Sequence, residues 1–199
     1  MTNFAGLARL RNVIKQVTSR AEAEGDTDSQ EFVDFCHMQL QELISCDDWL
    51  PEEFAAAHPD HYQQYLLHCD PLERFSLISF VWGPGQKTPI HNHETWGLIG
   101  MLRGSEISQA YEVADEGGLV PGRHEVLNPG DIAFVSPEAG DIHEVINAFE
   151  DQVSISIHLY GANIGVVERS VYEPASGRSR PFVSGYASAL TPNIWGLSA

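Results

Sequence analysis

The chain has 199 residues, 43% of them hydrophobic, and a formal net charge of −17. This length allows one domain with a sizeable core, and the negative charge argues against nucleic acids and anionic membranes as partners. The sequence contains no run of about 18 apolar residues, so no membrane span is predicted. The N-terminal residues lack the pattern of a secretory signal. Cys36, Cys46 and Cys69 are odd in number, which indicates free thiols and a cytoplasmic protein.

Apolar residues at helical spacing mark the first part of the chain. The spacing predicts one helix over residues 3–23 and a second that ends near Ser45, with Asp28 or Ser29 as its N-cap. Two shorter helices are predicted at 51–57 and 59–67, each starting with a proline in its first turn. We therefore expect a helical N-terminal segment over residues 1–70.

After Asp70 the pattern changes to short β-rich runs separated by Gly- and Pro-containing turns, Pro121-Gly122 among them. The runs are 75–82, 88–91, 96–102, 107–113, 123–127, 132–135, 143–148, 153–160 and 165–172. Many short strands at this spacing predict a mainly β fold, with a sandwich or barrel over residues 71–173. Residues 174–199 are expected to dock on it through their aromatic and apolar side chains, which gives a single domain over 1–199.

His91 and His93 provide the most specific chemical signal. In an extended run, side chains two positions apart point to the same side, so both imidazoles can bind one metal ion. His143, which opens a later strand-like run, offers a third nitrogen. The sequence therefore predicts a metal site of three histidines. Five other histidines are interpreted as ordinary packed or surface residues: His37, His58, His61, His68 and His124.

The runs around these histidines, 85–104 and 130–147, resemble the two motifs of the cupin superfamily. That resemblance implies a jelly-roll β-barrel holding one metal. The glutamate usual after the second histidine is absent, and Gly97 fills its place; Glu94 and Glu144 do not fit it. Three neutral imidazoles leave open positions for anionic ligands and dioxygen, which favours Fe(II). A closed site with adventitious Zn or Ni is the alternative, against which the lack of a fourth ligand argues.

A second polar group lies in the run 153–160, where polar and apolar residues alternate. The polar side of such a strand can simply face solvent. Inside a barrel, however, Ser156, His158 and Tyr160 can form a hydrogen-bonded row. That row would fix the phenol so that it can donate a proton to bound oxygen or substrate.

Taken together, these motifs resemble the thiol dioxygenases of the cysteine dioxygenase family. The resemblance extends from Tyr62 through Trp82 to the segments 161–169 and 192–195. It implies Fe(II) held by the three histidines, with the Ser-His-Tyr row at the active site. It also implies conversion of a small thiol to a sulfinic acid by both atoms of O2.

Three positions bear on the choice of thiol. Gly97 stands where the mammalian-type enzymes have a cysteine crosslinked to their tyrosine, and Gln64 stands where they have a carboxylate-binding arginine. In this respect the chain resembles the bacterial 3-mercaptopropionate dioxygenases, which implies that Arg169 and Gln64 bind the substrate. The alternative for Arg169 is a surface ion pair with Glu168 or Glu173.

We therefore expect an Fe(II) thiol dioxygenase acting on 3-mercaptopropionate and O2. Cysteine dioxygenase activity is the first alternative. A cupin that binds Zn or Mn without redox chemistry is the second.

Overall fold

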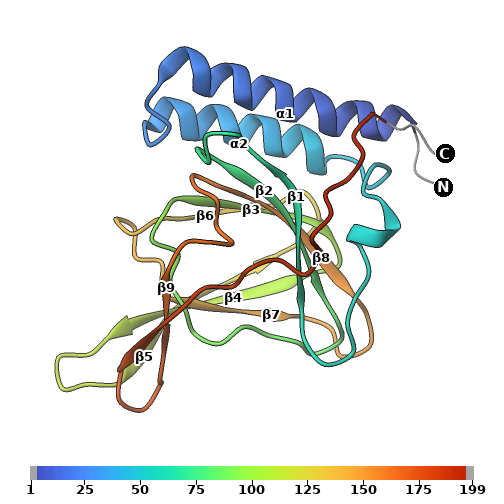
Figure 1. The fold of residues 1–199 in the computed structure, drawn as a ribbon. Coiled ribbons are helices and arrows are strands. Elements are labelled where there is room, and N and C mark those ends of the chain that lie inside the picture. The colour runs from blue at the N-terminus through green and yellow to red at the C-terminus, as the bar shows by residue number, and fades with distance from the viewer. Residues whose placement is uncertain (1–3, 196–199) are drawn as a thin grey trace.

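The computed structural model describes residues 4–195, so the predictions for residues 1–3 and 196–199 lie outside this part. Two helices precede a set of strands that form two facing sheets and a hairpin (Figure 1). The elements are α1 Phe4–Glu24, α2 Gln30–Ile44, the 3-10 turn η1 Glu52–Phe54, β1 Gln63–Cys69, β2 Ser76–Trp82, β3 Gly97–Arg103, β4 Glu106–Val113, β5 Leu119–Leu127, β6 Ile132–Val135, β7 His143–Asn147, β8 Ser154–Tyr160, β9 Arg169–Tyr172 and β10 Ser179–Phe182.

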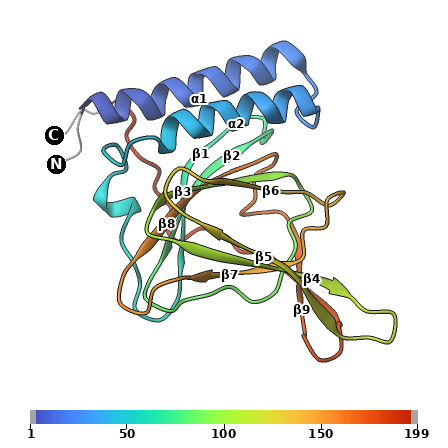
Figure 2. The same ribbon diagram turned by 180° about the vertical axis from the view of Figure 1, so that it is seen from behind.

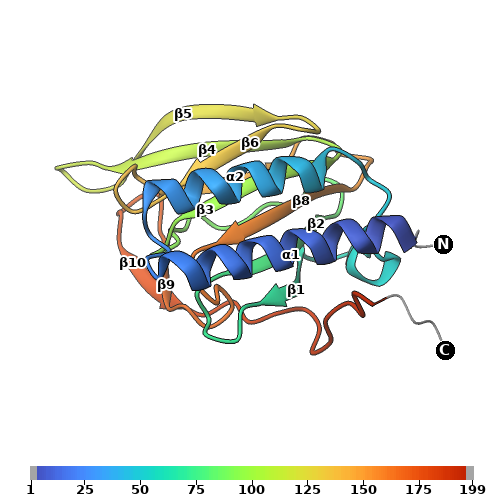
Figure 3. The same ribbon diagram turned by 90° about the horizontal axis from the view of Figure 1, so that it is seen from above.

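Helices α1 and α2 lie side by side over the outer face of the larger sheet (Figures 1 and 3). The hydroxyl of Ser29 accepts the Phe32 backbone N–H at 3.2 Å and so caps α2, as predicted. Gly100 in β3 gives α2 room, because a Cβ there would lie 3.1 Å from atoms of Leu40 and Ile44. Apolar side chains from the two helices and from the sheet beneath them form the largest apolar core.

The larger sheet has the strand order β1-β2-β8-β3-β6, and the sheet facing it has the order β5-β4-β7. The predicted fold class is confirmed: the chain is mainly β, with two facing sheets that follow an N-terminal helical segment. Within the described residues the two sheets stay separate, so the barrel is not closed by hydrogen bonds. Figure 2 shows the smaller sheet from the opposite side.

The prediction of helix over 59–67 was wrong. Residues 63–69 form β1, which pairs antiparallel with β2, and the predicted helix at 51–57 is a single 3-10 turn. Short apolar runs such as Tyr65–Leu67 do not distinguish helix from strand by period alone. Here the fully buried strand β2 decides, because it needs a hydrogen-bonded neighbour on each side. The helical segment therefore ends well before residue 70.

Smaller differences occur at three predicted strands. Residues 88–91 form no strand, and only His91 among them makes isolated bridges. The run 165–172 becomes a strand only at Arg169. Pro121-Gly122 lies inside β5 rather than in a turn. The turn between β4 and β5 instead uses Gly117 and Gly118, whose φ angles of +91° and +85° suit glycine.

The C-terminal stretch contacts the rest of the chain as far as the structure describes it. Strand β10 pairs with β9, and the Ile194 carbonyl accepts a hydrogen bond from the Arg11 guanidinium at 3.0 Å. No helix among residues 4–195 is long and apolar enough to span a membrane.

Candidate metal centre

The three predicted ligands come together. One nitrogen from each of His91, His93 and His143 lies within 4.8 Å of the other two, and the ring centroids are 4.9 Å apart in every pair. All three side chains are at most 8% exposed. Residues that belong to different sequence motifs thus form one compact nitrogen cluster.

Backbone contacts explain why the rings converge. His91 and His143 exchange both backbone hydrogen bonds, at 2.9 and 3.0 Å, so their side chains leave the same face. His93 lies beyond this bridge in the irregular segment 92–96, and its backbone N–H donates to a carboxylate oxygen of Asp141 at 2.7 Å. Asn92 ties this segment to β9 by accepting the Ser170 N–H at 2.8 Å. Glu94 in the same segment has an unusual φ of 58°.

Each Nδ1 of the cluster faces a protein group. That of His91 donates to the Pro89 carbonyl at 3.0 Å, and that of His143 lies 2.9 Å from the Ser108 hydroxyl. The Nδ1 of His93 faces an Asp141 carboxylate oxygen at 3.5 Å. These contacts leave the Nε2 atoms free to bind a metal, and outer partners of this kind orient metal-ligating imidazoles.

The electrostatics favour a metal cation over protons. Burial lowers the pKa of His91 and of His143 well below the usual value, and the neighbouring imidazoles add to the effect. The pKa of His93 is also lowered by burial, although Asp141 opposes this. Neutral imidazoles keep their lone pairs, so the donor set fits a divalent transition metal.

No acidic side chain among the described residues belongs to the cluster. Glu144, next to His143, instead accepts hydrogen bonds from Lys87 and Tyr111 at 3.1 and 2.9 Å. At Gly97 a Cβ would lie 2.7 Å from two ring carbons of Tyr160. The glycine therefore gives this ring room to lie next to the histidines, with its centroid 5.7 Å from that of His93.

The row predicted from strand alternation is present in β8. The Ser156 hydroxyl lies 2.8 Å from Nε2 of His158, whose Nδ1 lies 2.8 Å from the Tyr160 hydroxyl. The alternative of a solvent-exposed face is wrong, because all three side chains are at most 3% exposed. Burial raises the pKa of Tyr160, which the charge of Arg169 partly opposes, and so the phenol keeps its proton.

Arg169 is a buried cation on the same side of the barrel, and its charge reaches His91 and Tyr160. Its guanidinium donates to the Ser184 hydroxyl at 2.6 Å and lies 4.7 Å from the centroid of Phe182. Its Nε is buried without a hydrogen-bond partner among the described residues. The alternative of a surface ion pair does not hold, because Arg169 is only 4% exposed and Glu173 pairs with Arg178.

Gln64 reaches the same place from β1. Its amide nitrogen donates to Ser184 at 3.1 Å and to the Gly185 carbonyl at 3.0 Å. Ser184 therefore links Gln64 with Arg169. Gln64 and Ser184 also line a cleft of ≈ 480 Å³, together with Tyr62.

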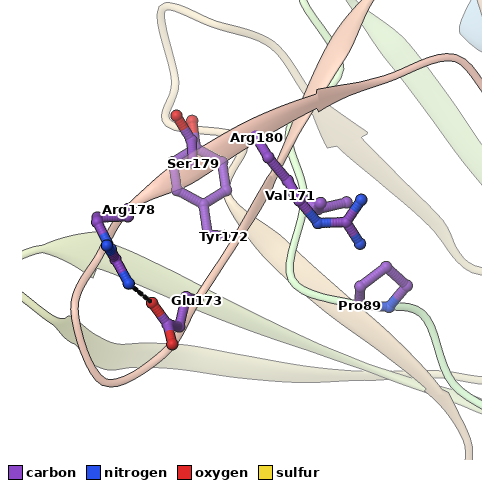
Figure 4. A pocket seen from close by; sticks show the side chains of 7 residues that line it. All are labelled: Pro89, Val171, Tyr172, Glu173, Arg178, Ser179 and Arg180. Carbon is purple, nitrogen blue, oxygen red and sulfur yellow. Dashed lines mark hydrogen bonds and ion pairs between the residues drawn. The ribbon is translucent and has the colours of Figure 1, made fainter.

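A second pocket adjoins this cleft along β9 and β10 (Figure 4). Arg178 is turned toward Glu173, whereas the exposed Arg180 extends toward Pro89 and lines both hollows. A cation, Arg180, therefore lies on the wall that the two pockets share.

Several residues that shape the centre were missed from sequence. Asp141, two positions before His143, was available as a signal, because carboxylates commonly orient metal-binding histidines. Ser108 and Ser184 gave none, since a serine in a strand or tail is unremarkable until the fold places it beside a functional group.

Comparison with known proteins agrees with this geometry. Residues 6–169 match the family described as Cysteine dioxygenase type I. Cysteine dioxygenase type 1 of Danio rerio is 26% identical over 117 residues, which cover 57% of this chain and 56% of that protein. The match thus spans little more than half of the relative's length.

Two solved structures illustrate the likeness of fold at lower identity. A cupin superfamily protein from Desulfitobacterium hafniense is 14% identical, with a TM-score of 0.44, over 59% of this chain and 93% of that one. A cupin 2 conserved barrel domain protein from Rhodopseudomonas palustris is 13% identical, with a TM-score of 0.43, over 59% of this chain and 73% of that one.

The family match covers most of the chain, and the protein therefore belongs to the cysteine dioxygenase type I family.

Proposed function

We propose that this protein is an Fe(II) thiol dioxygenase that adds both atoms of O2 to a small thiol and yields a sulfinic acid. The observation that carries the proposal is a buried cluster of three neutral histidines without a carboxylate, next to a buried arginine with an unpaired nitrogen. The family supports the class of reaction.

His91, His93 and His143 would hold the iron. Bound Fe(II) would supply the positions at which a thiolate and dioxygen meet and react. The protein contributes a dry and rigid surrounding, because the outer partners Pro89 and Ser108 fix two of the rings.

Arg169 is the group that would bind the substrate's carboxylate. A buried guanidinium with an unsatisfied nitrogen calls for an anionic partner, and carboxylates match its fork of donors. The Ser184 hydroxyl accepts a hydrogen bond from the guanidinium and another from the Gln64 amide. Gln64 would therefore support Arg169 through Ser184. The substrate's thiol would then be held at the iron and its carboxylate at Arg169.

Tyr160 would donate a hydrogen bond, and where needed a proton, to the oxidised sulfur or oxygen. Its hydroxyl stays protonated because burial raises its pKa, and the row through His158 and Ser156 fixes its position.

3-Mercaptopropionate is the substrate that we favour. The buried charged group whose field reaches the histidines is the cation Arg169, which suits a thiol acid, and the carboxylate of Asp141 is already engaged by His93. L-Cysteine adds an ammonium group, and among the described residues no carboxylate belongs to the histidine cluster to receive it.

Oxygen consumption and sulfinate formation across a panel of thiols test the substrate. We expect a higher kcat/KM for 3-mercaptopropionate than for L-cysteine; equal or better use of L-cysteine would reverse the assignment. Loss of activity on chelation, and recovery with Fe(II) but not with Zn or Mn, tests the reaction class. Activity with Zn alone would instead favour a non-redox cupin.

A further inference from the structure

Glu106, the first residue of β4, is a buried carboxyl group that the proposed mechanism does not use. It is 0% exposed. Its Oε1 accepts a hydrogen bond from the Ser154 hydroxyl at 3.3 Å, and its Oε2 has no partner among the described residues. A buried carboxyl with an unsatisfied oxygen requires an explanation.

The fold brings Glu106 to the end of the Ser-His-Tyr row. The turn before β4 contains Gly104, where a Cβ would lie 2.8 Å from that of Ser154 in β8. This close approach joins the start of β4 to β8. Ser156 lies two residues beyond Ser154 on the same face of β8, so its hydroxyl is the next polar group along that face after the one that donates to Glu106.

Within residues 4–195 no basic side chain compensates the carboxyl. Burial raises its pKa to about 8, and the hydroxyls of Ser156 and Ser154 oppose this only in part. Its strand neighbours are Leu127 in β5 and Asn147 in β7, which carry no charge. The ionisable group coupled to it is Tyr160, at the far end of the row.

The row has only two consistent arrangements of hydrogens. Burial lowers the pKa of His158 well below its usual value, so the ring is neutral and carries one N–H. If Ser156 donates to Nε2, then Nδ1–H donates to Tyr160, whose own hydrogen is free. If Nε2–H donates to Ser156, then Tyr160 must donate to Nδ1.

We propose that Glu106 is a positioning residue that selects between these arrangements, a role that rests on the proposed function. Protonated Glu106 donates toward Ser156, and the Tyr160 hydrogen then points into the metal cavity. Ionised Glu106 accepts from Ser156 and Ser154, and the Tyr160 hydrogen turns back to His158. Only the first arrangement offers a donor to substrate or oxygen.

The two arrangements differ by one proton. Going from the first to the second moves one proton along each link of the row, from the carboxyl to Ser156, from Ser156 to His158 and from His158 to Tyr160. One proton then leaves the Tyr160 hydroxyl into the cavity. No bond between heavy atoms changes, and nothing is oxidised or reduced.

Nitrogen-15 NMR of His158 in the metal-free, full-length protein reads the arrangement directly, because the shifts of Nδ1 and Nε2 report which one is protonated. In the wild type we expect Nδ1–H at pH values below the pKa of Glu106 and Nε2–H above it. Glu106→Gln, which does not titrate, should keep one tautomer throughout. The proposal would be overturned if the tautomer of His158 in the wild type did not change with pH. It would also be overturned if Glu106→Gln showed the same change of tautomer as the wild type.

Two further variants keep the test decisive. Glu112→Gln changes an exposed carboxyl on the same strand and should keep the wild-type switch. Ser156→Ala cuts the row between Glu106 and His158, and should abolish the switch even if Glu106→Gln fails to fold. A switch that persists in Ser156→Ala contradicts the proposed route.

A kinetic arm links the switch to turnover. With 3-mercaptopropionate, wild-type kcat should fall about tenfold as pH rises through the pKa of Glu106, as expected for loss of a general acid, whereas Glu106→Gln should show no such fall. If no thiol is oxidised, the proposed function fails while the NMR result still decides the role of Glu106.

Discussion

The buried carboxyl of Glu106 makes a quantitative prediction about stability, which Glu106→Gln tests. Its pKa is 4.5 in the unfolded chain and about 8 in the folded protein. Between these values the folded state keeps its proton and the unfolded state has lost it, so stability falls as pH rises. The difference between 8 and 4.5, at about 1.4 kcal/mol for each pKa unit, is about 5 kcal/mol.

Urea unfolding of both proteins at a series of pH values measures this directly. The free energy of unfolding of Glu106→Gln, relative to wild type, should rise by up to about 5 kcal/mol between pH 4.5 and 8 and stay level above that. Glu112→Gln, at an exposed position, should follow the wild type. Parallel curves for wild type and Glu106→Gln would mean that Glu106 ionises in the folded state as freely as in the unfolded one, and would refute the reasoning.

Four other changes test the metal centre and its surroundings. His143→Ala should lose iron, by elemental analysis, while His124→Ala at an exposed position keeps it. Tyr160→Phe should lower kcat about 10- to 100-fold with iron retained; loss of iron would contradict the role given to it. Arg169→Met should raise KM for the thiol acid about 10- to 100-fold, the worth of a charge-assisted hydrogen bond. Gly97→Ala should lower activity because its Cβ would meet the Tyr160 ring at 2.7 Å; unchanged kinetics would mean that the ring moves aside freely.

The sequence predicted the chemistry of the centre better than its scaffold. Period two placed Ser156, His158 and Tyr160 on one face, and the strand they lie in follows that rule. His91 and His93 converge although His93 lies outside any strand, because Asp141 holds its backbone from another part of the chain. The spacing of His91 and His93 indicated that their side chains lie together. The contact that brings them together comes from Asp141, which is distant in the sequence.

The errors have the same origin. Residues 63–69 form a strand because β2 is buried and needs a neighbour, which a window of seven residues does not encode. Glu106 drew no attention because a glutamate at the start of a strand is ordinarily exposed. Its burial arises where the two sheets meet, at Ser154, and only the fold brings these residues together.

The local charge at the centre differs from the overall charge of the protein. The chain carries −17, yet Arg169 lies buried beside three neutral imidazoles and Arg180 lies at the rim of the cleft. A neutral Glu106 adds no negative charge within the row, so the proposed thiol acid would meet a positive site inside an acidic protein. Since exposed charges act over about 10 Å at 0.1 M salt, Arg180→Glu should lower kcat/KM at low ionic strength and have little effect at high salt. A decrease that is the same at every salt concentration would mean that Arg180 touches the substrate instead of guiding it.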